Sequence, residues 1–544
     1  MRLSSSHEHV TLKRELNFWD LVMVSLGGVI GSGWLYGAWR GAQLAGPASI
    51  LSWIIGGVLA ILLGLTFAEL AGMFPEAGAL ARYPQFSHGT FVSFVMSWAM
   101  ILAFGTVPPI EAEAAVQFAN YYVPGLYVGS TLTSEGLLLC VALMIVFFVL
   151  NFFGVLIFAK TNTVWTIIKI VVPAGTIVGL LIAAVHFQNL DAARLGGFTP
   201  YGTAGIFAAV PLGGIIYAYE GFEQCMDMAG EAKNPQRDVP RAVILSIVAA
   251  IVLYVLLQVV WLVAMPAREL HHGWLGITWS SPFVNLAGAL GMGWLTVVLY
   301  ADAIWSPAGS GNVFLASTAR VIYAMSRNRY FPQAFAWISK KSHVPYIAVI
   351  VSFLVGLIFL APFPSWAALV GVDSSATVLI YMIGPISSAS LRKTAPDLKR
   401  PYRLGGMSVI GPLAFIVCSL VIYWSGWATD SVIMMSVLAG VLLYAYGVSS
   451  FAVGDERYGW KSIKAGLWLV VYLVVMLVLS FFGSKQFGAA HPFIAYPWDM
   501  LVVAAISVVF YYWGANSGIE TEEIQHYKKE GAFYLEEEEL SLPS

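Results

Sequence analysis

Long apolar segments dominate the hydrophobic pattern of this chain, and short polar segments separate them. A membrane-spanning helix needs about 20 mostly apolar residues, because the hydrocarbon core of a bilayer is about 30 Å thick. Fourteen segments have this character, at about residues 18–44, 47–72, 90–119, 137–159, 161–186, 204–230, 242–265, 288–324, 345–362, 366–391, 406–425, 432–452, 464–483 and 497–513. The eighth is too long for one straight span, so we expect it to continue as a cytoplasmic helix. The pattern predicts an all-α polytopic membrane protein with about 14 transmembrane helices.

Composition agrees with this class. Hydrophobic residues make up 59% of the 544 residues and charged residues only 11%, whereas soluble proteins carry about 25% charged residues. The net charge of −2 gives no reason to expect a nucleic-acid partner. The three cysteines lie in apolar runs, so we expect no disulfide framework. The motifs of ATP-driven pumps and of common hydrolases are missing, and we expect neither an enzyme nor a cofactor or metal.

Lysine and arginine residues are distributed unequally between the two sides of the predicted membrane. With the N-terminus inside, 23 of the 28 fall in inside segments, and only Arg40, Arg194, Arg268 and Lys485 fall outside. The remaining one, Lys169, lies within a span. Cytoplasmic loops retain Lys and Arg, so this asymmetry predicts a multi-pass protein of the cell membrane with both termini cytoplasmic.

Glycine interrupts two of the predicted spans, the first and the sixth. The first reads Gly-Gly-Val-Ile-Gly-Ser-Gly at 27–33, and the second reads Gly-Gly-Ile-Ile-Tyr-Ala-Tyr-Glu-Gly at 213–221. In transporters, paired interruptions mark the substrate site, because unwound backbone survives only where it lines a cavity. Five spans precede the second interruption, so the two halves start in opposite directions. We therefore predict a five-plus-five inverted repeat, with residues 18–186 and 204–391 as its halves.

The remaining parts of the chain are expected outside this core. Residues 406–513 are predicted to form peripheral helices eleven to fourteen. Residues 1–17 are interpreted as a disordered cytoplasmic tail, and residues 514–544 as an acidic, solvated cytoplasmic tail.

Several motifs resemble those of amino acid permeases of the APC superfamily. They are the first interruption at 27–33, Ala-Glu-Leu-Ala-Gly-Met-Phe-Pro-Glu-Ala-Gly at 68–78, Tyr-Ala-Tyr-Glu-Gly-Phe-Glu at 217–223, Glu-Ala-Lys-Asn-Pro-Gln-Arg-Asp-Val-Pro-Arg-Ala at 231–242 and Arg-Val-Ile-Tyr-Ala-Met-Ser-Arg-Asn at 320–328. The chain is identified as a member of this superfamily over about residues 15–405. The Ser-Gly-Trp-Leu run at 32–35, followed by Arg40, is most similar to a prokaryotic branch that includes aspartate:proton symporters. The resemblance implies a LeuT-like core and amino acid transport.

The first interruption has the right chemistry for one end of an amino acid. A helix that restarts near Ser32 leaves the amides of Gly31, Ser32 and Gly33 without intrahelical partners, at a positive helix end suited to a carboxylate. The carbonyls near Val29 and Ile30 can accept from an ammonium, and so can those of the second interruption near Tyr217 and Glu220. The resemblance implies the same arrangement. The predicted substrate site comprises Ile30, Gly31, Ser32, Gly33, Tyr217, Ala218, Tyr219 and Glu220. The alternative is a glycine packing face between helices.

Lys169 lies near the middle of the fifth span. A charge at the bilayer centre costs about 3 kcal/mol or more, so a function is expected of it. Some proton-coupled members of the family that this chain resembles carry a lysine at the matching place, where sodium-coupled relatives of the same fold bind an ion. That resemblance implies that Lys169 is a proton carrier. The alternative is a lysine that reaches toward the membrane interface.

Other acidic residues are weaker candidates. Glu220 is expected to contact the ammonium or to titrate, and Glu223 to be structural or proton-linked. Asp302 is expected either to pair with Lys169 or an incoming cation, or to form a structural ion pair. Glu111 and Glu113 are placed in the outer third of the third span, where they line the outer vestibule or face outside water.

Side chains that select the substrate are harder to identify. Tyr217 and Tyr219 are predicted either to gate the substrate or simply to pack, and Arg40 either to attract a side-chain carboxylate or to anchor the helix at the interface. We predict an amino acid:proton symporter that works by alternating access, with an acidic substrate such as aspartate or glutamate favoured. The alternatives are an amino acid or amine exchanger, a permease for neutral or cationic amino acids, and a sensor without flux.

Overall fold

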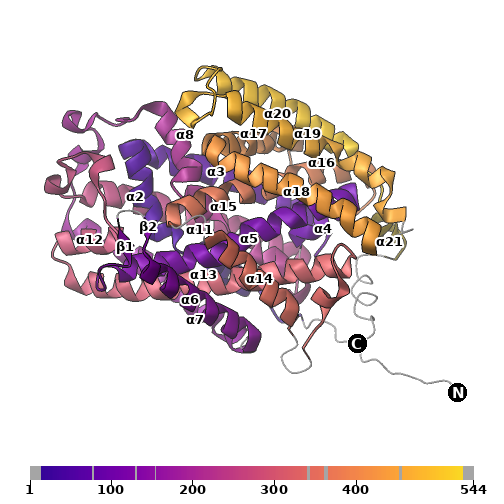
Figure 1. Ribbon diagram of the computed structural model, residues 1–544, viewed down its shortest axis with the longest axis horizontal. Coiled ribbons are helices and arrows are strands. Elements are labelled where there is room, and N and C mark those ends of the chain that lie inside the picture. Colours follow the sequence, from indigo (N-terminus) through magenta and orange to yellow (C-terminus); the bar gives the residue numbers. More distant parts are fainter. Residues whose placement is uncertain are drawn as a thin grey trace.

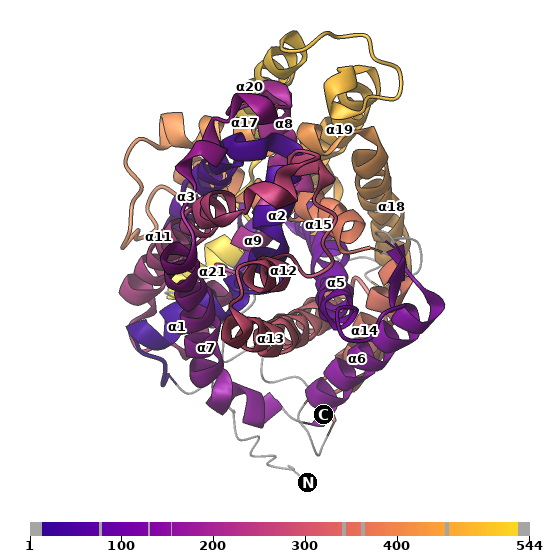
Figure 2. The same ribbon diagram turned by 90° about the vertical axis from the view of Figure 1, so that its left-hand side faces the viewer.

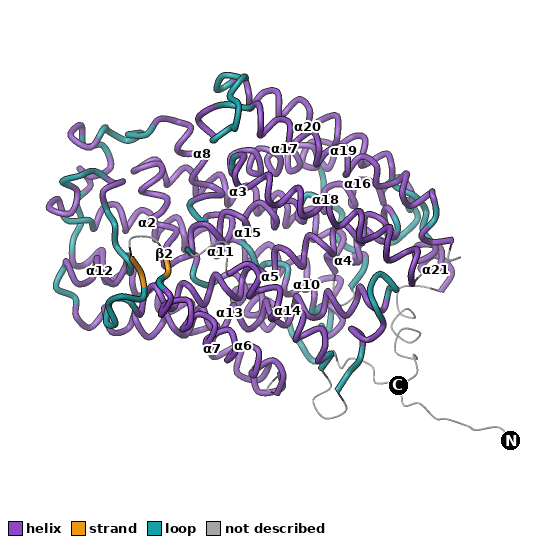
Figure 3. The backbone as a smooth tube through the Cα atoms, in the orientation of Figure 1, coloured by secondary structure: helices purple, strands orange, loops and turns teal. Residues whose placement is uncertain are grey.

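The computed structural model describes residues 14–75, 79–128, 131–153, 155–339, 344–360, 365–451 and 456–530. Helices make up nearly all of its regular structure (Figure 1). The part before residue 200 contains α1 (Phe18–Val29), α2 (Gly33–Ala45), α3 (Ser49–Met73), α4 (Ala79–His88), α5 (Thr90–Ala119), β1 (Tyr127–Val128), β2 (Thr131–Leu132), α6 (Ser134–Phe153) and α7 (Val155–Ala183). The two strands, coloured orange in Figure 3, pair antiparallel, a feature that the all-helical prediction lacked.

The rest of the described chain is helical. It contains α8 (Gly202–Leu212), α9 (Ile215–Tyr219), α10 (Gln224–Asp227), α11 (Pro235–Ala264), α12 (Pro282–Ala289), α13 (Gly293–Arg327), α14 (Tyr346–Leu360), α15 (Trp366–Tyr381), α16 (Ile383–Thr394), α17 (Met407–Ser425), α18 (Trp427–Phe451), α19 (Trp460–Phe482), α20 (Trp498–Ser517) and α21 (Glu522–Glu530). The single helix α13 covers most of the long eighth segment and continues three residues beyond it. Its 35 residues extend about 52 Å at 1.5 Å per residue, well beyond the bilayer core.

Ten helical segments among the described residues are long and apolar enough to cross a membrane. Three shorter apolar helices, α1, α8 and α14, accompany them. The predicted multi-pass helical membrane protein is confirmed at this level. The count of 14 spans and the five-plus-five repeat remain predictions.

The helices surround a small central group. Figure 2 looks along most of them and shows α2 and α9 near the middle, with α3, α5, α11, α13 and α15 around them. Burial follows this arrangement, since 94% of the most apolar window of α5 is buried against 28% for α6. The two interrupted segments therefore lie where lipid cannot reach their backbone.

The N-terminal segment is partly ordered, which differs from the expected free tail. Leu16 donates its amide to the Glu231 carbonyl (3.0 Å) and accepts from the Lys233 amide (2.9 Å). This bridge fixes the start of α1 against the loop after the second interruption. Residues 1–13 of the predicted tail lie outside the described residues.

The beginning of the predicted C-terminal tail is also docked. After α20, the Ile519 amide donates to the Ser87 carbonyl at 3.0 Å. The Gln85 amide group donates to Glu523 at 2.7 Å, and the Tyr527 ring lies 5.7 Å from that of Phe86. The expectation of a solvated tail from residue 514 is therefore wrong for α21, and the acidic run at 536–539 lies outside the described residues.

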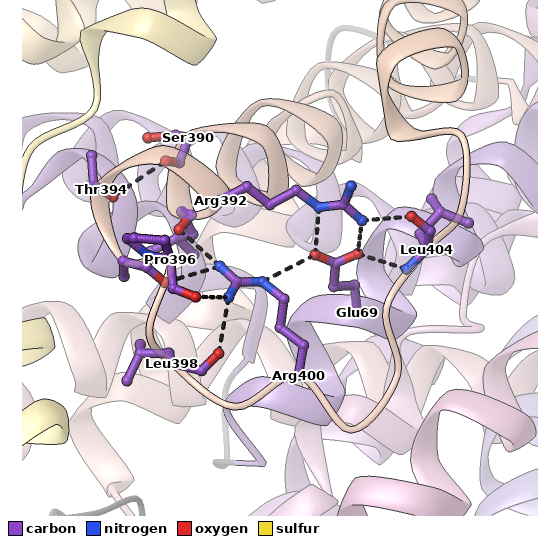
Figure 4. Close-up of polar contacts among 10 residues, drawn as sticks. Glu69, Ser390, Arg392, Thr394, Pro396, Leu398, Arg400 and Leu404 are labelled. Atoms are coloured by element: carbon purple, nitrogen blue, oxygen red, sulfur yellow. Dashed lines mark hydrogen bonds and ion pairs between the residues drawn. The ribbon is translucent and has the colours of Figure 1, made fainter.

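A buried carboxylate fastens the loop that follows α16 (Figure 4). Glu69, near the end of α3, accepts two hydrogen bonds from Arg392, at 2.8 and 2.5 Å, and one from the Leu404 amide at 2.8 Å. Arg400 forms an ion pair with the same carboxylate at 3.5 Å. Arg400 also donates to the carbonyls of Leu391, Ala395, Pro396 and Leu398. We refer to Glu69, Arg392 and Arg400 as the guanidinium clamp.

Candidate functional site

The first interruption lies between α1 and α2, as predicted. Asn17 and Asp20 form a capping box that starts α1, and the helix ends at Val29. Ile30 is extended, with φ −88° and ψ 90°, and helical structure resumes at Gly33. The Ser32 side chain does not cap this second start, so its amides need partners from elsewhere.

The second segment is interrupted twice. Gly214 takes φ +77° after α8, a conformation that favours glycine. The short helix α9 then ends at Tyr219, Glu220 is extended, and Gly221 takes φ +108°. Tyr217, Ala218 and Tyr219 therefore lie within a short helix between these two points of the second segment, where we predicted unwound backbone.

The two interrupted segments touch through their backbones. A Cβ on Gly221 would lie 2.4 Å from the carbonyl carbon of Gly28, and one on Gly33 would lie 2.8 Å from the Cα of Ala218. Only glycine permits such approach. The predicted glycine packing face and the predicted interruptions are thus features of the same residues.

Glu111 lies at the helix end that we predicted for a carboxylate. Its two oxygens accept from the Ser32 amide at 3.2 and 3.1 Å, and Tyr217 donates its hydroxyl to Oε1 at 2.7 Å. The side chain is 1% exposed. The expectation that Glu111 lines the outer vestibule or faces outside water is therefore wrong, because its position on α5 directs it into the centre of the protein. The Gly31 amide was also expected to be free and instead donates to the Val29 carbonyl.

Lys169 is buried at the end of α1. Its ammonium donates to the Gly27 carbonyl at 2.9 Å and to the Ser310 hydroxyl at 3.0 Å. The side chain is 2% exposed, which excludes the interpretation that it reaches the membrane interface. The carbonyl end of a helix carries partial negative charge, so the position suits a cation.

Hydroxyl groups of the protein already donate hydrogen bonds to the carbonyls that we expected to accept from a substrate ammonium. Tyr254 donates to the Val29 carbonyl at 2.9 Å, and Ser306 donates to the Ile30 carbonyl at 3.3 Å. A substrate ammonium would have to share or replace these donors.

A small cavity lies between the first interrupted segment and the second. Its volume is about 10 Å³, and its lining residues are Gly28, Val29, Gly31, Glu111, Tyr217, Glu220 and Phe314. This is room for about one water molecule. An amino acid can therefore enter only if the surrounding helices move.

Of three further candidates, Glu220 lines this cavity, and Glu223 and Tyr219 do not. Glu220 accepts from the Thr377 hydroxyl at 3.1 Å. Glu223 accepts from the Tyr381 hydroxyl at 2.6 Å and from the Gly221 amide at 3.0 Å. Tyr219 points elsewhere.

Tyr219 packs away from the cavity. Its hydroxyl donates to the Trp53 carbonyl at 3.1 Å, and its ring lies 5.5 Å from that of Tyr254. This arrangement favours the packing interpretation for Tyr219. Tyr217 instead contacts Glu111 directly, so the two tyrosines differ in role.

Asp302, Glu113 and Arg40 do not join the cavity lining. Asp302 and Glu113 are 2% and 0% exposed, and their carboxylate oxygens lack hydrogen-bond partners in the described structure. Within the same residues, no ion pair links Asp302 to Lys169. Arg40 donates to Gln43 at 2.6 Å and lies over the Trp39 ring, as an anchoring residue would.

Sequence reasoning missed several residues at this site. Trp366 donates its indole N–H to the Ser32 hydroxyl at 3.0 Å, and Ser306, Ser310 and Tyr254 supply the contacts described above. Hydroxyl and indole groups carry no sequence signal among so many apolar helices. Asp373 did carry one, because it is an isolated acid within an apolar span, the same criterion that identified Lys169.

Comparisons with known proteins agree with this geometry. Residues 16–431 match the family model described as amino acid permease. The glutamate/serine transporter AimA of Bacillus subtilis (strain 168) is 41% identical over 529 residues, which cover 95% of this chain and 96% of that protein. The aspartate-proton symporter of the same organism is 38% identical over 522 residues, or 95% and 99% of the two chains. The branched-chain amino acid permease BcaP of this bacterium is 27% identical over 80% of this chain and 93% of that protein.

The matched region includes both interruptions, Lys169 and Glu111. The resemblance inferred from the motifs is confirmed, and the family is one of transporters. The chain belongs to the amino acid permease family.

Proposed function

We propose that this protein imports an acidic amino acid together with protons, by alternating access around the two interrupted helices. The observation that carries the proposal is that the site already holds one carboxylate and one ammonium from its own side chains. Glu111 binds the amide end of α2, and Lys169 binds the carbonyl end of α1. These are the two charges of an amino acid, each opposite the helix end that favours it.

The substrate carboxylate would replace Glu111 at Ser32. Two carboxylates cannot share one buried anion site while both are ionised. A proton that arrives with the substrate resolves this conflict, which is why we favour proton coupling over exchange.

An acidic substrate is supported by the relatives. The two most extensively matching relatives reported above are named as a glutamate/serine transporter and an aspartate-proton symporter. The former name makes serine a second substrate to test. One proton that moves down 100 mV supplies about 2.3 kcal/mol, enough for roughly fifty-fold accumulation at about 1.36 kcal/mol per tenfold.

Uptake into proteoliposomes tests the proposal. Labelled aspartate, glutamate, serine, leucine and lysine would each be offered with and without an inside-alkaline gradient. We expect the gradient to stimulate uptake of aspartate or glutamate. Uptake that requires an internal amino acid and ignores pH would instead identify an exchanger, and stimulated uptake of another amino acid would retain symport but reject the acidic substrate.

A further inference from the structure

Three buried carboxyl groups meet where the second interruption contacts α15. Glu220 and Glu223 flank Gly221, and Asp373 faces them from α15. Their exposed fractions are 3%, 0% and 0%. Within the described ranges, no Lys, Arg or His forms an ion pair or a hydrogen bond with any of the three. An isolated buried carboxylate is very costly, so groups of this kind hold protons or bind cations.

One face of α15 carries Asp373 and the hydroxyl donors to both glutamates. Asp373, Thr377 and Tyr381 are spaced four residues apart, which places them one above another on the same side of a helix. Thr377 donates to Glu220 at 3.1 Å, and Tyr381 donates to Glu223 at 2.6 Å. These three residues of α15 therefore form a polar stripe that faces the second interrupted segment.

The carboxyl groups of Glu220 and Asp373 interact with each other across this contact. Thr377, the donor to Glu220, follows Asp373 by one helical turn on the same face of α15. Thr106 donates to Asp373 Oδ1 at 3.0 Å. Glu220 Oε2 and Asp373 Oδ2 have no donor from the described part of the protein. Two carboxylates in contact repel, whereas a carboxylate and a carboxylic acid form a strong hydrogen bond. A proton between them is the donor that these oxygens lack.

The other titratable groups near the pair do not remove this need. They are Glu223 and Tyr217 on the interrupted segment, Tyr381 on α15 and Glu111 on α5. All four are acidic or neutral groups. Lys169, by contrast, interacts with Glu111 and Asp302.

We propose that Glu220 and Asp373 form a shared-proton site that carries a transported proton, separate from Lys169. The inference rests on the proposed symport. Glu220 lines the cavity between the interruptions, so the proton lies beside the space that opens for substrate. Asp373 lies on α15, whereas Glu220 lies in the extended segment after α9. Movement that separates these elements breaks the contact, leaves two carboxylates and releases the proton to the side that has opened.

The test measures the ratio of protons to amino acid in proteoliposomes, using labelled substrate and a lumenal pH dye. In Asp373→Asn we expect this ratio to fall by about one, because one shared proton is removed. Counterflow of labelled against unlabelled substrate, which needs no gradient, should persist. Glu220→Gln should lower the ratio in the same way. Asp430→Asn is the matched control, because Asp430 is equally buried but lies on α18 and accepts from Ser480.

The outcomes separate this inference from the proposed function. If the wild type shows no gradient-stimulated uptake, the symport itself fails. If the wild type is stimulated and both variants retain its proton ratio, only the shared-proton site fails. A folded Asp373→Asn that loses counterflow as well would assign the pair to substrate binding and overturn the inference.

Infrared spectroscopy tests the same proton without dependence on transport. A protonated carboxyl absorbs at a carbonyl frequency distinct from that of a carboxylate. Wild-type protein at neutral pH should show such a band, and Asp373→Asn should weaken it. A wild-type spectrum without any protonated carboxyl would overturn the inference even if neither variant folds.

Discussion

The guanidinium clamp and the acids at the second interruption are two opposite solutions to a buried carboxyl group. In the clamp, Glu69 receives two guanidinium groups and one backbone amide. At the interruption, Glu220 and Asp373 receive one hydroxyl each, and no cation reaches them from the described chain. A paired carboxylate stays ionised and holds two elements together, whereas an unpaired one gains and loses protons. The difference separates a structural acid from a transporting acid.

The largest expected effect comes from breaking the clamp. Glu69→Gln leaves two partly buried guanidinium groups without an anion. The loss of one partner of a buried pair costs about 3–5 kcal/mol, and we expect a loss toward the lower end of that range because the arginines are partly solvated. Asp373→Asn should cost about 1 kcal/mol or less, because a neutral amide replaces a group already held near neutrality by a shared proton. Thermal unfolding of both variants in detergent measures the contrast. Equal losses in the two variants would show that burial alone, rather than pairing, determines the cost.

The next effect concerns transport. Lys169→Ala removes the ammonium from the carbonyl end of α1, and we expect it to abolish gradient-driven uptake while counterflow partly persists. Lys485→Ala, at an exposed lysine, is the control. Retention of full dependence on an inward proton gradient in Lys169→Ala would exclude Lys169 as a coupling residue.

A smaller effect is expected when one hydroxyl group beside the acids at the second interruption is removed. Thr377→Val keeps the shape of the side chain but removes the donor to Glu220, a hydrogen bond worth about 1 kcal/mol. The hydroxyl stabilises the ionised carboxylate, so its loss favours the protonated form. We therefore expect a stronger proton affinity, seen as a shift of the pH dependence of uptake toward higher pH, with little loss of stability. Thr394→Val is a control at a threonine whose hydroxyl bonds only within its own helix. Identical pH profiles in the two variants would contradict the role of Thr377.

The smallest expected effect lies at the docked C-terminal segment. Gln85→Ala removes its contact with Glu523 and should cost about 0.5–1 kcal/mol locally. Limited proteolysis should then cut near α21 sooner than in the wild type, while uptake is unchanged. Cleavage at the wild-type rate would show that the aromatic contacts of Tyr527 alone hold the segment.

The sequence predicted those features that follow from local chemistry. Apolar length located the helical segments, and glycine located the two interruptions, because both effects act within a few residues. Lys169 was recognisable because a charge within an apolar span is costly. The partner of an amide is different, since Glu111 is 79 residues from Ser32. Only the packing of α5 against the first interruption turns Glu111 inward, and no local pattern encodes that contact.

The contact between Glu111 and Ser32 has a consequence for the kinetics of the transport cycle. A symporter must return empty after each delivery, and a helix end with an unpaired amide would make that step slow. Glu111 occupies the vacated position, so the unloaded carrier keeps the hydrogen bond that the substrate would otherwise supply. We therefore expect the return of the unloaded protein to be fast enough for net accumulation. A variant without this carboxylate should turn over mainly when substrate is present on both sides of the membrane.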